Sequence, residues 1–141
     1  MRGTANRRSR PMPALTAFYG GLLALLFLGL SLNVIRRRYH YRVAFGSDGP
    51  VPLQRAIRGQ ANFAEYVPLA LLLLLCLELL GGPAWALHAV GLCLLAGRLA
   101  HGICFACLES AAPLRVGGML LTFAALITAA IGNLAMAVNS F

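Results

Sequence analysis

The sequence contains very few acidic residues and no lysine. Asp48, Glu65, Glu78 and Glu109 are the only acids among 141 residues, and charged residues make up 11% of the chain. Soluble domains carry roughly 25% charged residues. A soluble fold of this length would bury about two thirds of its surface and cover the rest with polar side chains. The polar residues needed for that cover are missing, so the composition excludes an ordinary water-soluble domain.

All twelve basic residues are arginine, and the formal net charge is +8. Such an excess of positive charge could indicate nucleic-acid binding. The arginines gather, however, in a tail at residues 1–13 and in residues 36–42, directly after an apolar run. This placement fits anionic membrane headgroups better, so no nucleic-acid partner is expected. The exclusive use of arginine has two explanations, namely recognition of phosphate or carboxylate groups, or a genome biased toward certain codons.

The cysteines predict neither a disulfide framework nor a metal site. Cys76, Cys93, Cys104 and Cys107 lie inside apolar segments, where a thiol behaves as a small hydrophobe. Cys104 and Cys107 have the spacing of a redox pair but lack its sequence context. No metal and no redox role is therefore expected.

Hydrophobic residues make up 60% of the chain and form four long runs. We expect membrane spans at about 14–35, 55–80, 84–107 and 116–138. The first contains 22 residues without a formal charge, and at about 1.5 Å per residue this crosses a hydrocarbon core of about 30 Å. Gly81-Gly82-Pro83 is a strong stop between the second and third spans. The predicted fold class is an all-α membrane protein, a four-transmembrane-helix bundle over residues 14–138.

The distribution of arginine predicts how the spans are oriented. Four spans place both termini on one side of the membrane. Loop one joins the first and second spans, and loop three joins the third and fourth. The positive-inside rule favours a cytoplasmic location for these two loops, which carry Arg36, Arg37, Arg38, Arg42 and Arg115. The expected location is a bacterial inner membrane. The hydrophilic residues 1–11 precede an ordinary opening, MPALTAFYGG, so we hypothesise that Met12 is the true start and that the tail is not native. Aromatic side chains near the span ends are expected to form an interfacial belt, namely Tyr19, Tyr39, Tyr41, Tyr66 and Trp85.

The second and third spans carry polar residues that are costly in a bilayer, at about 2.5 to 3.5 kcal/mol for an ionisable group. On the second span, Arg58, Asn62 and Glu65 stand at i, i+4 and i+7 and therefore share one face. Tyr66 lies four residues beyond Asn62 on that face. On the third span the corresponding stripe consists of Arg98, His101 and Phe105. Each such group needs a partner, an aqueous cavity or a ligand.

Three interpretations of these stripes remain open. In the first, they are structural pairs between helices: Arg58 with Glu65 or Glu109, and Arg98 with Glu78. In the second, they form a pocket for a small zwitterionic or anionic molecule, in which arginine clamps a carboxylate and a glutamate receives an ammonium group. The third, a transport path along Glu78 and Arg98, lacks the paired broken helices or inverted repeat that such folds show.

Residues 58–68, RGQANFAEYVP, resemble the R-A-x-x-N-x-x-E-Y-x-P signature of the MAPEG family, the membrane-associated proteins in eicosanoid and glutathione metabolism. GRLAH at residues 97–101 and PLRVGGMLLT at residues 113–122 resemble third-helix and fourth-helix segments of the same family. Together these similarities cover residues 12–138. The resemblance implies a homotrimer of four-helix subunits that binds glutathione as a co-substrate at the subunit interfaces, near the cytoplasmic side.

The resemblance also implies roles for individual residues. Arg115 matches the arginine that points at the glutathione sulfur, and the positions that match glutathione contacts are Arg58, Asn62, Glu65, Tyr66, His101 and Arg38. Phe105 and Val116 depart from the family pattern, because a tyrosine and a serine are often found there, and Ile103 stands where bacterial relatives show an aromatic hydroxyl. The implied function is a glutathione-dependent transferase or peroxidase acting on lipophilic electrophiles. A non-catalytic protein of the same fold that binds lipid or glutathione is the alternative.

Overall fold

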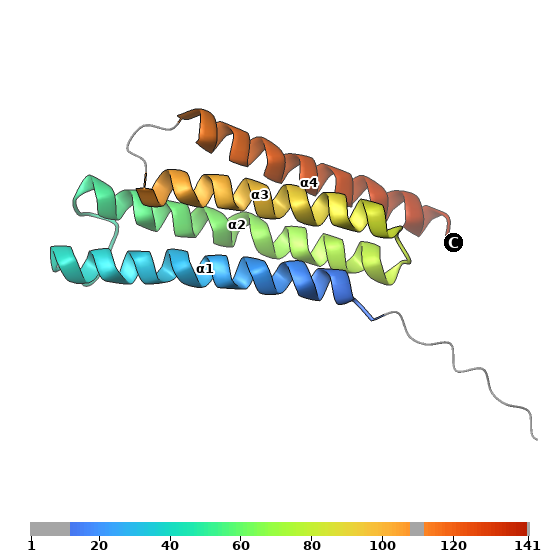
Figure 1. Ribbon diagram of the computed structural model, residues 1–141, viewed down its shortest axis with the longest axis horizontal. Helices are drawn as coiled ribbons and strands as arrows, with labels where there is room; N and C mark the ends of the chain where they lie inside the picture. The colour runs from blue at the N-terminus through green and yellow to red at the C-terminus, as the bar shows by residue number, and fades with distance from the viewer. Residues whose placement is uncertain (1–11, 108–111, 141) are drawn as a thin grey trace, which may run out of the picture.

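The described residues form four long antiparallel helices (Figure 1). The computed structural model describes residues 12–107 and 112–140, so the start-site hypothesis and the pairing of Glu109 lie outside the described residues. The helices are α1 (Ala14–Tyr41), α2 (Val51–Leu79), α3 (Ala84–Cys107) and α4 (Ala112–Val138). Each is long and apolar enough to cross a membrane. The predicted all-α architecture with four membrane-spanning helices is therefore confirmed.

Helices α2 and α3 form the centre of the bundle. Helix α1 packs against both of them on one side and α4 packs against both on the other, and within the described residues α1 and α4 do not touch. We call the end at which α1 finishes and α2 and α4 begin the loop-one end, and the opposite end, near both chain termini, the terminal end. Toward the loop-one end, α4 leans away from α2 and α3 (Figure 1).

Three helices extend beyond the predicted spans at the loop-one end. Helix α1 continues to Tyr41, α2 begins at Val51 and α4 begins at Ala112. Charge ends the apolar part of a span but does not end a helix, so the arginine-rich end of α1 remains helical. Pro52 and Pro113 lie in the first turns of α2 and α4, where a missing N–H group leaves no helical hydrogen bond unmade.

Glu78 caps the first turn of α1 from the neighbouring helix. Its two carboxylate oxygens accept hydrogen bonds from the backbone N–H groups of Leu15 and Thr16, at 2.9 and 2.7 Å. Pro13, at the N-cap position of α1, makes no side-chain hydrogen bond to the helix, and a carboxylate also interacts favourably with a helix N-terminus. The predicted pair between Glu78 and Arg98 is therefore wrong.

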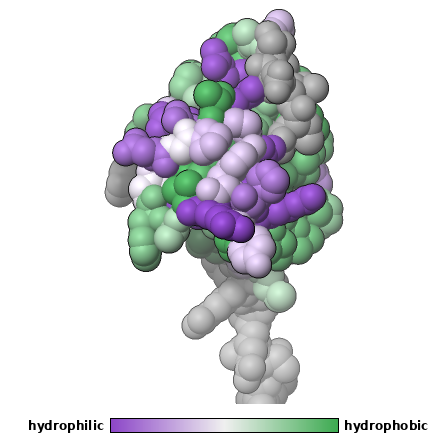
Figure 2. All heavy atoms as spheres, turned by 90° about the vertical axis from the view of Figure 1, so that its left-hand side faces the viewer, coloured by the Kyte–Doolittle hydropathy of each residue, from purple (hydrophilic) through white to green (hydrophobic). Residues whose placement is uncertain are grey.

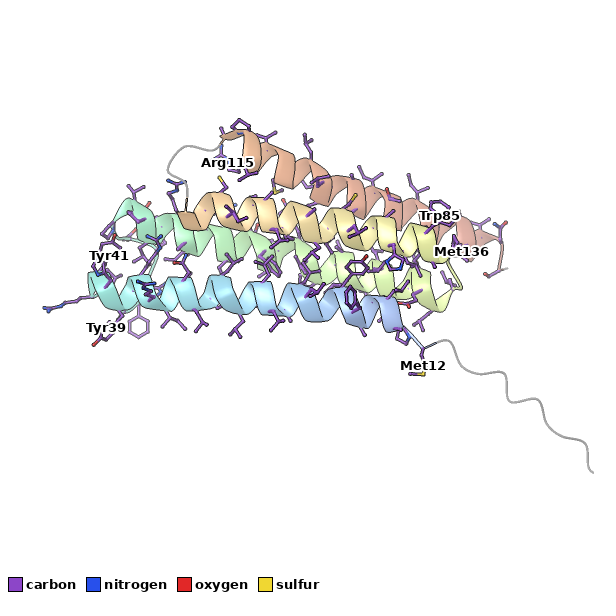
Figure 3. All side chains as sticks on the ribbon, viewed as in Figure 1. Met12, Tyr39, Tyr41, Trp85, Arg115 and Met136 are labelled. Carbon is purple, nitrogen blue, oxygen red and sulfur yellow. The ribbon has the colours of Figure 1, made fainter. Side chains whose placement is uncertain are left out.

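The aromatic residues divide between the belt and the core. Tyr39 is 88% exposed and Trp85 is 75% exposed, and they lie at opposite ends of the bundle (Figure 3), as an interfacial belt requires. Tyr19 was expected in the same belt but is only 2% exposed. Its ring packs directly on Gly91, and its hydroxyl lies 2.9 Å from Nδ1 of His88. Tyr19 is therefore a core residue, because Gly91 leaves room for the ring between α1 and α3.

Candidate functional site

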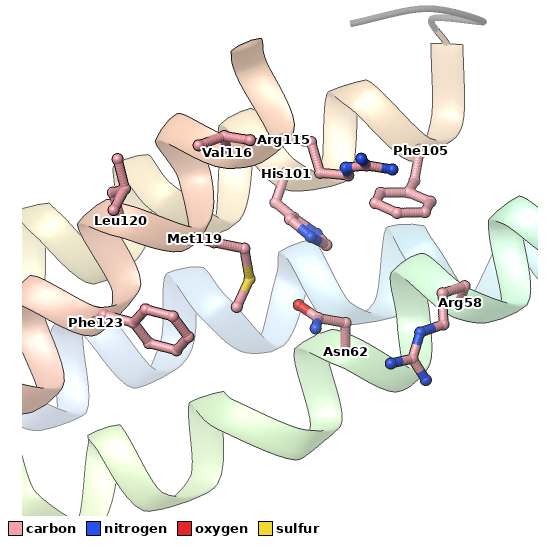
Figure 4. Close-up of a pocket in the computed structure, with 9 residues that line it drawn as sticks. All are labelled: Arg58, Asn62, His101, Phe105, Arg115, Val116, Met119, Leu120 and Phe123. Atoms are coloured by element: carbon pink, nitrogen blue, oxygen red, sulfur yellow. The ribbon is translucent and has the colours of Figure 1, made fainter. Parts of the chain in front are cut away.

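A groove opens where α4 leans away from α2 and α3, at the loop-one end (Figure 4). Its volume is about 500 Å³, within the roughly 300 to 1,000 Å³ range of small-molecule sites. Three helices contribute its lining residues, which are Arg58, Asn62, His101, Phe105, Arg115, Val116, Met119, Leu120 and Phe123. One part of the groove is polar and basic, and α4 supplies an apolar wall.

The polar part of the groove combines side chains from three helices. Arg58 comes from α2, His101 from α3 and Arg115 from α4 (Figure 4). Among the described residues, none that lines the groove is acidic. Arg58 lies 3.4 Å from Glu65 on its own helix, and both side chains are largely exposed, at 66% and 46%. An exposed pair of this kind contributes little to stability, so the groove presents a net positive surface to an incoming anion.

Arg98 lies beside the groove and links α2, α3 and α4. It is fully buried. Its Nη1 donates to Oδ1 of Asn62 at 2.9 Å, and its Nε and Nη2 donate to the Thr122 hydroxyl at 3.0 and 2.5 Å. The Thr122 hydroxyl in turn donates to the Gly118 carbonyl at 2.8 Å. Oδ1 of Asn62 accepts from Arg98, and the N–H donors of this carboxamide remain for a ligand in the groove.

Arg98 has no acidic partner within the described residues. Its positive charge meets the Asn62 and Thr122 oxygens, the Met119 sulfur at 3.4 Å and the Tyr66 ring, whose centroid lies 5.7 Å from Cζ. Neutral dipoles compensate a buried charge only in part. The charge of Arg98 therefore adds to the positive potential of the groove. The sequence analysis placed Arg98 in the polar stripe of the third span but gave it no role toward glutathione. It did not single out Thr122, which lies in the segment that resembles the fourth helix of the MAPEG family.

Two glycines set the crossing of α3 and α4 beside this network. A Cβ atom on Gly97 would lie 2.7 Å from the Gly118 carbonyl oxygen, and a Cβ on Gly118 would lie 2.7 Å from the Gly97 carbonyl oxygen. The same Cβ on Gly118 would lie 3.0 Å from the backbone nitrogen of His101. Only glycine allows the two backbones to come this close. The contact fixes the distance from Arg98 to Thr122 and the position of His101.

His101 and Phe105 form a stacked pair over the groove. The imidazole is 4% exposed, and its centroid lies 4.8 Å from that of the Phe105 ring at an interplanar angle of 32°. Phe105 packs closely on Gly59, where a Cβ would come within 2.8 Å of the Phe105 Cβ. Phe105 therefore orients the imidazole, but it supplies no hydroxyl group to the groove.

The groove gathers four of the predicted site residues, namely Arg58, Asn62, His101 and Arg115. Tyr66 lies next to it, with its ring 5.7 Å from that of Phe123, and Glu65 is connected to it through Arg58. Arg38 is not brought to this groove. Its guanidinium donates to the carbonyls of Ala44 and Gly46 in loop one, at 3.4 and 2.9 Å, and it lines a different cavity.

Comparison with known proteins identifies the family. The MAPEG family profile matches residues 16–135. The chain is 41% identical over 119 residues to the inner membrane protein YecN of Escherichia coli strain K12, covering 84% of this chain and 89% of YecN. YecN of Escherichia coli O6:H1 strain CFT073 gives the same identity and coverage. With its four apolar helices, the chain is a multi-pass protein of the bacterial inner membrane, and it belongs to the MAPEG family.

Proposed function

We propose that the chain is a glutathione-dependent transferase or peroxidase that acts on lipophilic electrophiles from the membrane. One observation carries the proposal: Arg58, Asn62, His101 and Arg115 surround a groove in which no described lining residue is acidic, next to an apolar wall. Glutathione carries two carboxylates and a thiol, so it suits the basic part of the groove. A lipophilic electrophile suits the apolar part.

Different residues of the groove bind different parts of glutathione. Arg58 binds one carboxylate, because guanidinium and carboxylate groups can form two parallel hydrogen bonds. The N–H donors of Asn62 hold a second oxygen of the tripeptide. Glu65, 3.4 Å from Arg58, receives the glutathione ammonium group. His101 and Arg115 are then left for the thiol end.

Arg115 stabilises the thiolate form of glutathione. A thiol with a pKa near 8.5 must lose about 2 pKa units to be mostly ionised at neutral pH, which corresponds to about 2.7 kcal/mol. A charge pair 4 Å apart supplies about 1 kcal/mol in water but about 4 kcal/mol at an effective dielectric constant near 20. Arg115 is exposed in the single chain. The thiolate therefore forms efficiently only when other groups exclude water from Arg115.

A homotrimer would exclude that water. In the single chain the groove is open, and the outer face of α4 presents exposed apolar residues along its length, among them Leu120, Ile127 and Ile131. A second copy seated beside the groove would cover Arg115 and bury part of this face. We therefore propose the trimer as the active form.

The chemical step then needs little from the protein beyond binding and charge. The thiolate sulfur donates an electron pair to a carbon of the electrophile, a sulfur–carbon bond forms, and the leaving group departs with the electrons of the broken bond. Val116, Leu120 and Phe123 provide an apolar surface for the electrophile, and all three are partly open to the surroundings. A substrate dissolved in the bilayer can reach this wall without crossing water.

A glutathione titration of the purified protein tests the proposal. We expect ultraviolet absorbance of a bound thiolate in the wild type and its loss in Arg115→Ala, with glutathione still bound. Arg36→Ala is the matched control, because Arg36 is an exposed arginine at the same end but outside the groove. Glutathione binding without a thiolate signal in the wild type would contradict the catalytic role.

The second candidate is a non-catalytic protein that binds lipid or glutathione in the same groove. It is favoured by one observation: within residues 12–107 and 112–140, no residue that lines the groove carries a hydroxyl group. Phe105 and Val116 stand where the family resemblance leads us to expect tyrosine and serine. In catalysis such a hydroxyl would donate a hydrogen bond to the sulfur. The titration above separates the candidates, because this alternative expects bound glutathione to remain a thiol.

A further inference from the structure

A second cavity lies at the end of α1, against the start of loop one, and the proposed function does not use it. Its volume is about 900 Å³. Its lining includes Arg36, Arg38 and Arg42 together with the aromatic side chains of Tyr39 and His40, and none of the described residues that line it is acidic. We call it the basic cavity. Figure 2 looks onto the loop-one end and shows hydrophilic side chains gathered across it, with hydrophobic side chains at the flanks.

The wall of the basic cavity is held in place by the backbone. Arg42 ends α1 in the left-handed conformation, with φ of 55°, and the chain turns back so that the Val43 N–H donates to the Arg38 carbonyl at 3.1 Å. The Arg38 guanidinium then donates to the carbonyls of Ala44 and Gly46. Arg38 is therefore a positioning residue for the cavity wall. The exposed side chains of Arg36 and Arg42 make no hydrogen bond within the described residues, so their donors are available.

The basic cavity lies at the depth of the lipid headgroups. Residues 14–35 of α1 carry no formal charge over 22 residues, which span about 33 Å at 1.5 Å per residue and so cover a hydrocarbon core of about 30 Å. Arg36 begins at the end of this stretch. The exposed ring of Tyr39 lies at the same level (Figure 3), where tyrosine is enriched in membrane proteins.

An exposed apolar ridge leads along α1 to the cavity. Leu25, Leu28, Leu32 and Ile35 are each more than half exposed. Their spacing of three and four residues places them on one face of the helix, and Ile35 also lines the basic cavity. A ligand that matches both features has an apolar chain and an anionic head.

We propose that the basic cavity binds the phosphate of an anionic phospholipid, with an acyl chain along the ridge. Arg36 and Arg42 donate to the phosphate oxygens, as guanidinium groups do in other phosphate sites. The ridge accounts for the choice of a lipid over free phosphate, because free phosphate gains nothing from an apolar surface. This site is independent of the groove, so failure of either proposal leaves the other intact.

Native mass spectrometry of the detergent-purified full chain tests the site, with added phosphatidylglycerol or phosphatidylcholine of identical acyl chains. We expect tighter binding of phosphatidylglycerol. Arg36→Gln and Arg42→Gln should each weaken it about fivefold, the factor that corresponds to about 1 kcal/mol for each basic residue near an anionic surface. Binding of phosphatidylcholine should not change. Arg115→Gln is the matched control, because it removes a charge at the same end outside the basic cavity.

A second variant tests the ridge separately. Leu28→Ser with Leu32→Ser keeps every charge, and it should also weaken phosphatidylglycerol binding. Equal binding of the two lipids, or an equal loss of phosphatidylglycerol in Arg115→Gln, would overturn the proposal. If inorganic phosphate at the same concentration competes with phosphatidylglycerol, the ligand is free phosphate and the proposal of a lipid site is overturned. If the ridge variant loses self-association while its lipid binding is unchanged, the ridge is a contact between copies, and the proposal fails.

Discussion

At the terminal end of the bundle, several polar side chains hydrogen-bond within the chain, although Thr16 Oγ1 and Asn133 Oδ1 are buried without a partner among the residues that the structure describes. At the loop-one end, several arginines line open cavities instead. Glu78 caps α1, the Tyr19 hydroxyl meets His88, and Asn133 on α4 donates to the Leu73 carbonyl of α2 at 2.8 Å. At the loop-one end, by contrast, Arg115 lines the groove (Figure 4) and forms no hydrogen bond within the described residues.

This difference indicates that the residues that stabilise the fold and the residues available for ligand binding lie at opposite ends of the bundle. Hydrogen bonds closed inside the chain stabilise the fold and leave nothing for a ligand. Donors directed into a cavity contribute little to the fold and are available for binding. Variants at the terminal end should therefore change the free energy of unfolding alone, and variants lining the groove should mainly change ligand affinity. Arg98 lies between the two regions and should affect both.

Arg98→Ala should have the largest effect. It removes five hydrogen bonds of a charged group and leaves a void between three helices, so we expect a loss of about 3 kcal/mol or more in the free energy of unfolding. Glutathione affinity should fall as well, because Asn62 loses its partner. Denaturant unfolding in detergent micelles measures the first effect. Arg36→Ala is the control, because Arg36 is an exposed arginine. If the two variants are equally stable, the hydrogen bonds of Arg98 to Asn62 and Thr122 do not stabilise the fold.

Gly118→Ala should have the next largest effect. The added methyl group meets the Gly97 carbonyl and the backbone of His101, and overpacking of this kind costs about 1 to 3 kcal/mol. Gly117→Ala is a matched control, because nothing lies within 4 Å of a Cβ at that position. Both variants are compared by thermal unfolding and glutathione titration. If they behave alike, the close crossing of α3 and α4 does not position the groove.

Glu78→Ala tests the terminal end. Loss of the cap on α1 should destabilise the fold by about 1 kcal/mol, as measured for other N-cap substitutions. Glutathione affinity and phosphatidylglycerol binding should stay at wild-type values, because both sites lie at the other end of the bundle. A clear fall in either affinity would break the separation between stability and binding.

Glu65→Gln should have the smallest effect on stability. The exposed ion pair with Arg58 is worth less than about 1 kcal/mol, so the free energy of unfolding should fall by less than that. Glutathione affinity should nevertheless fall, because the variant removes the acceptor for the ammonium group. Isothermal titration measures this change, and an unchanged affinity would return the Arg58–Glu65 pair to a purely structural role.

The fold and much of the groove follow from the sequence because they depend on local patterns. Apolar length defines the four spans, and the spacing of Arg58 and Asn62 places both on one face of α2. The predicted pair between Glu78 and Arg98 was wrong because the prediction did not compare how deep the two residues lie in the bundle. Arg98 is 14 residues beyond the start of α3, or about 21 Å, while Glu78 is one residue from the end of α2. A pair between them would have to cross most of the bundle.

Other contacts could not be read from the sequence at all. The lean of α4 depends on how several helices pack together, and this lean opens the groove between Arg58 and Arg115. The turn at Arg42 folds loop one back onto Arg38, and a helix-one position that resembles a glutathione contact is thereby drawn into the basic cavity. Both features arise from tertiary packing, which local spacing does not encode.

Within the described part of the chain, the one-sided placement of arginine has an electrical consequence. Every arginine in the described residues lies in the half of the bundle toward the loop-one end. A respiring bacterium keeps its cytoplasm at negative voltage, and moving one positive charge across the membrane against this field costs about 2.3 kcal/mol per 100 mV. Because α1 is anchored by several charges and Arg98 is buried among the helices, inversion of the bundle would move many charges at once. The membrane voltage therefore favours the predicted orientation, in which the groove and the basic cavity face the cytoplasm.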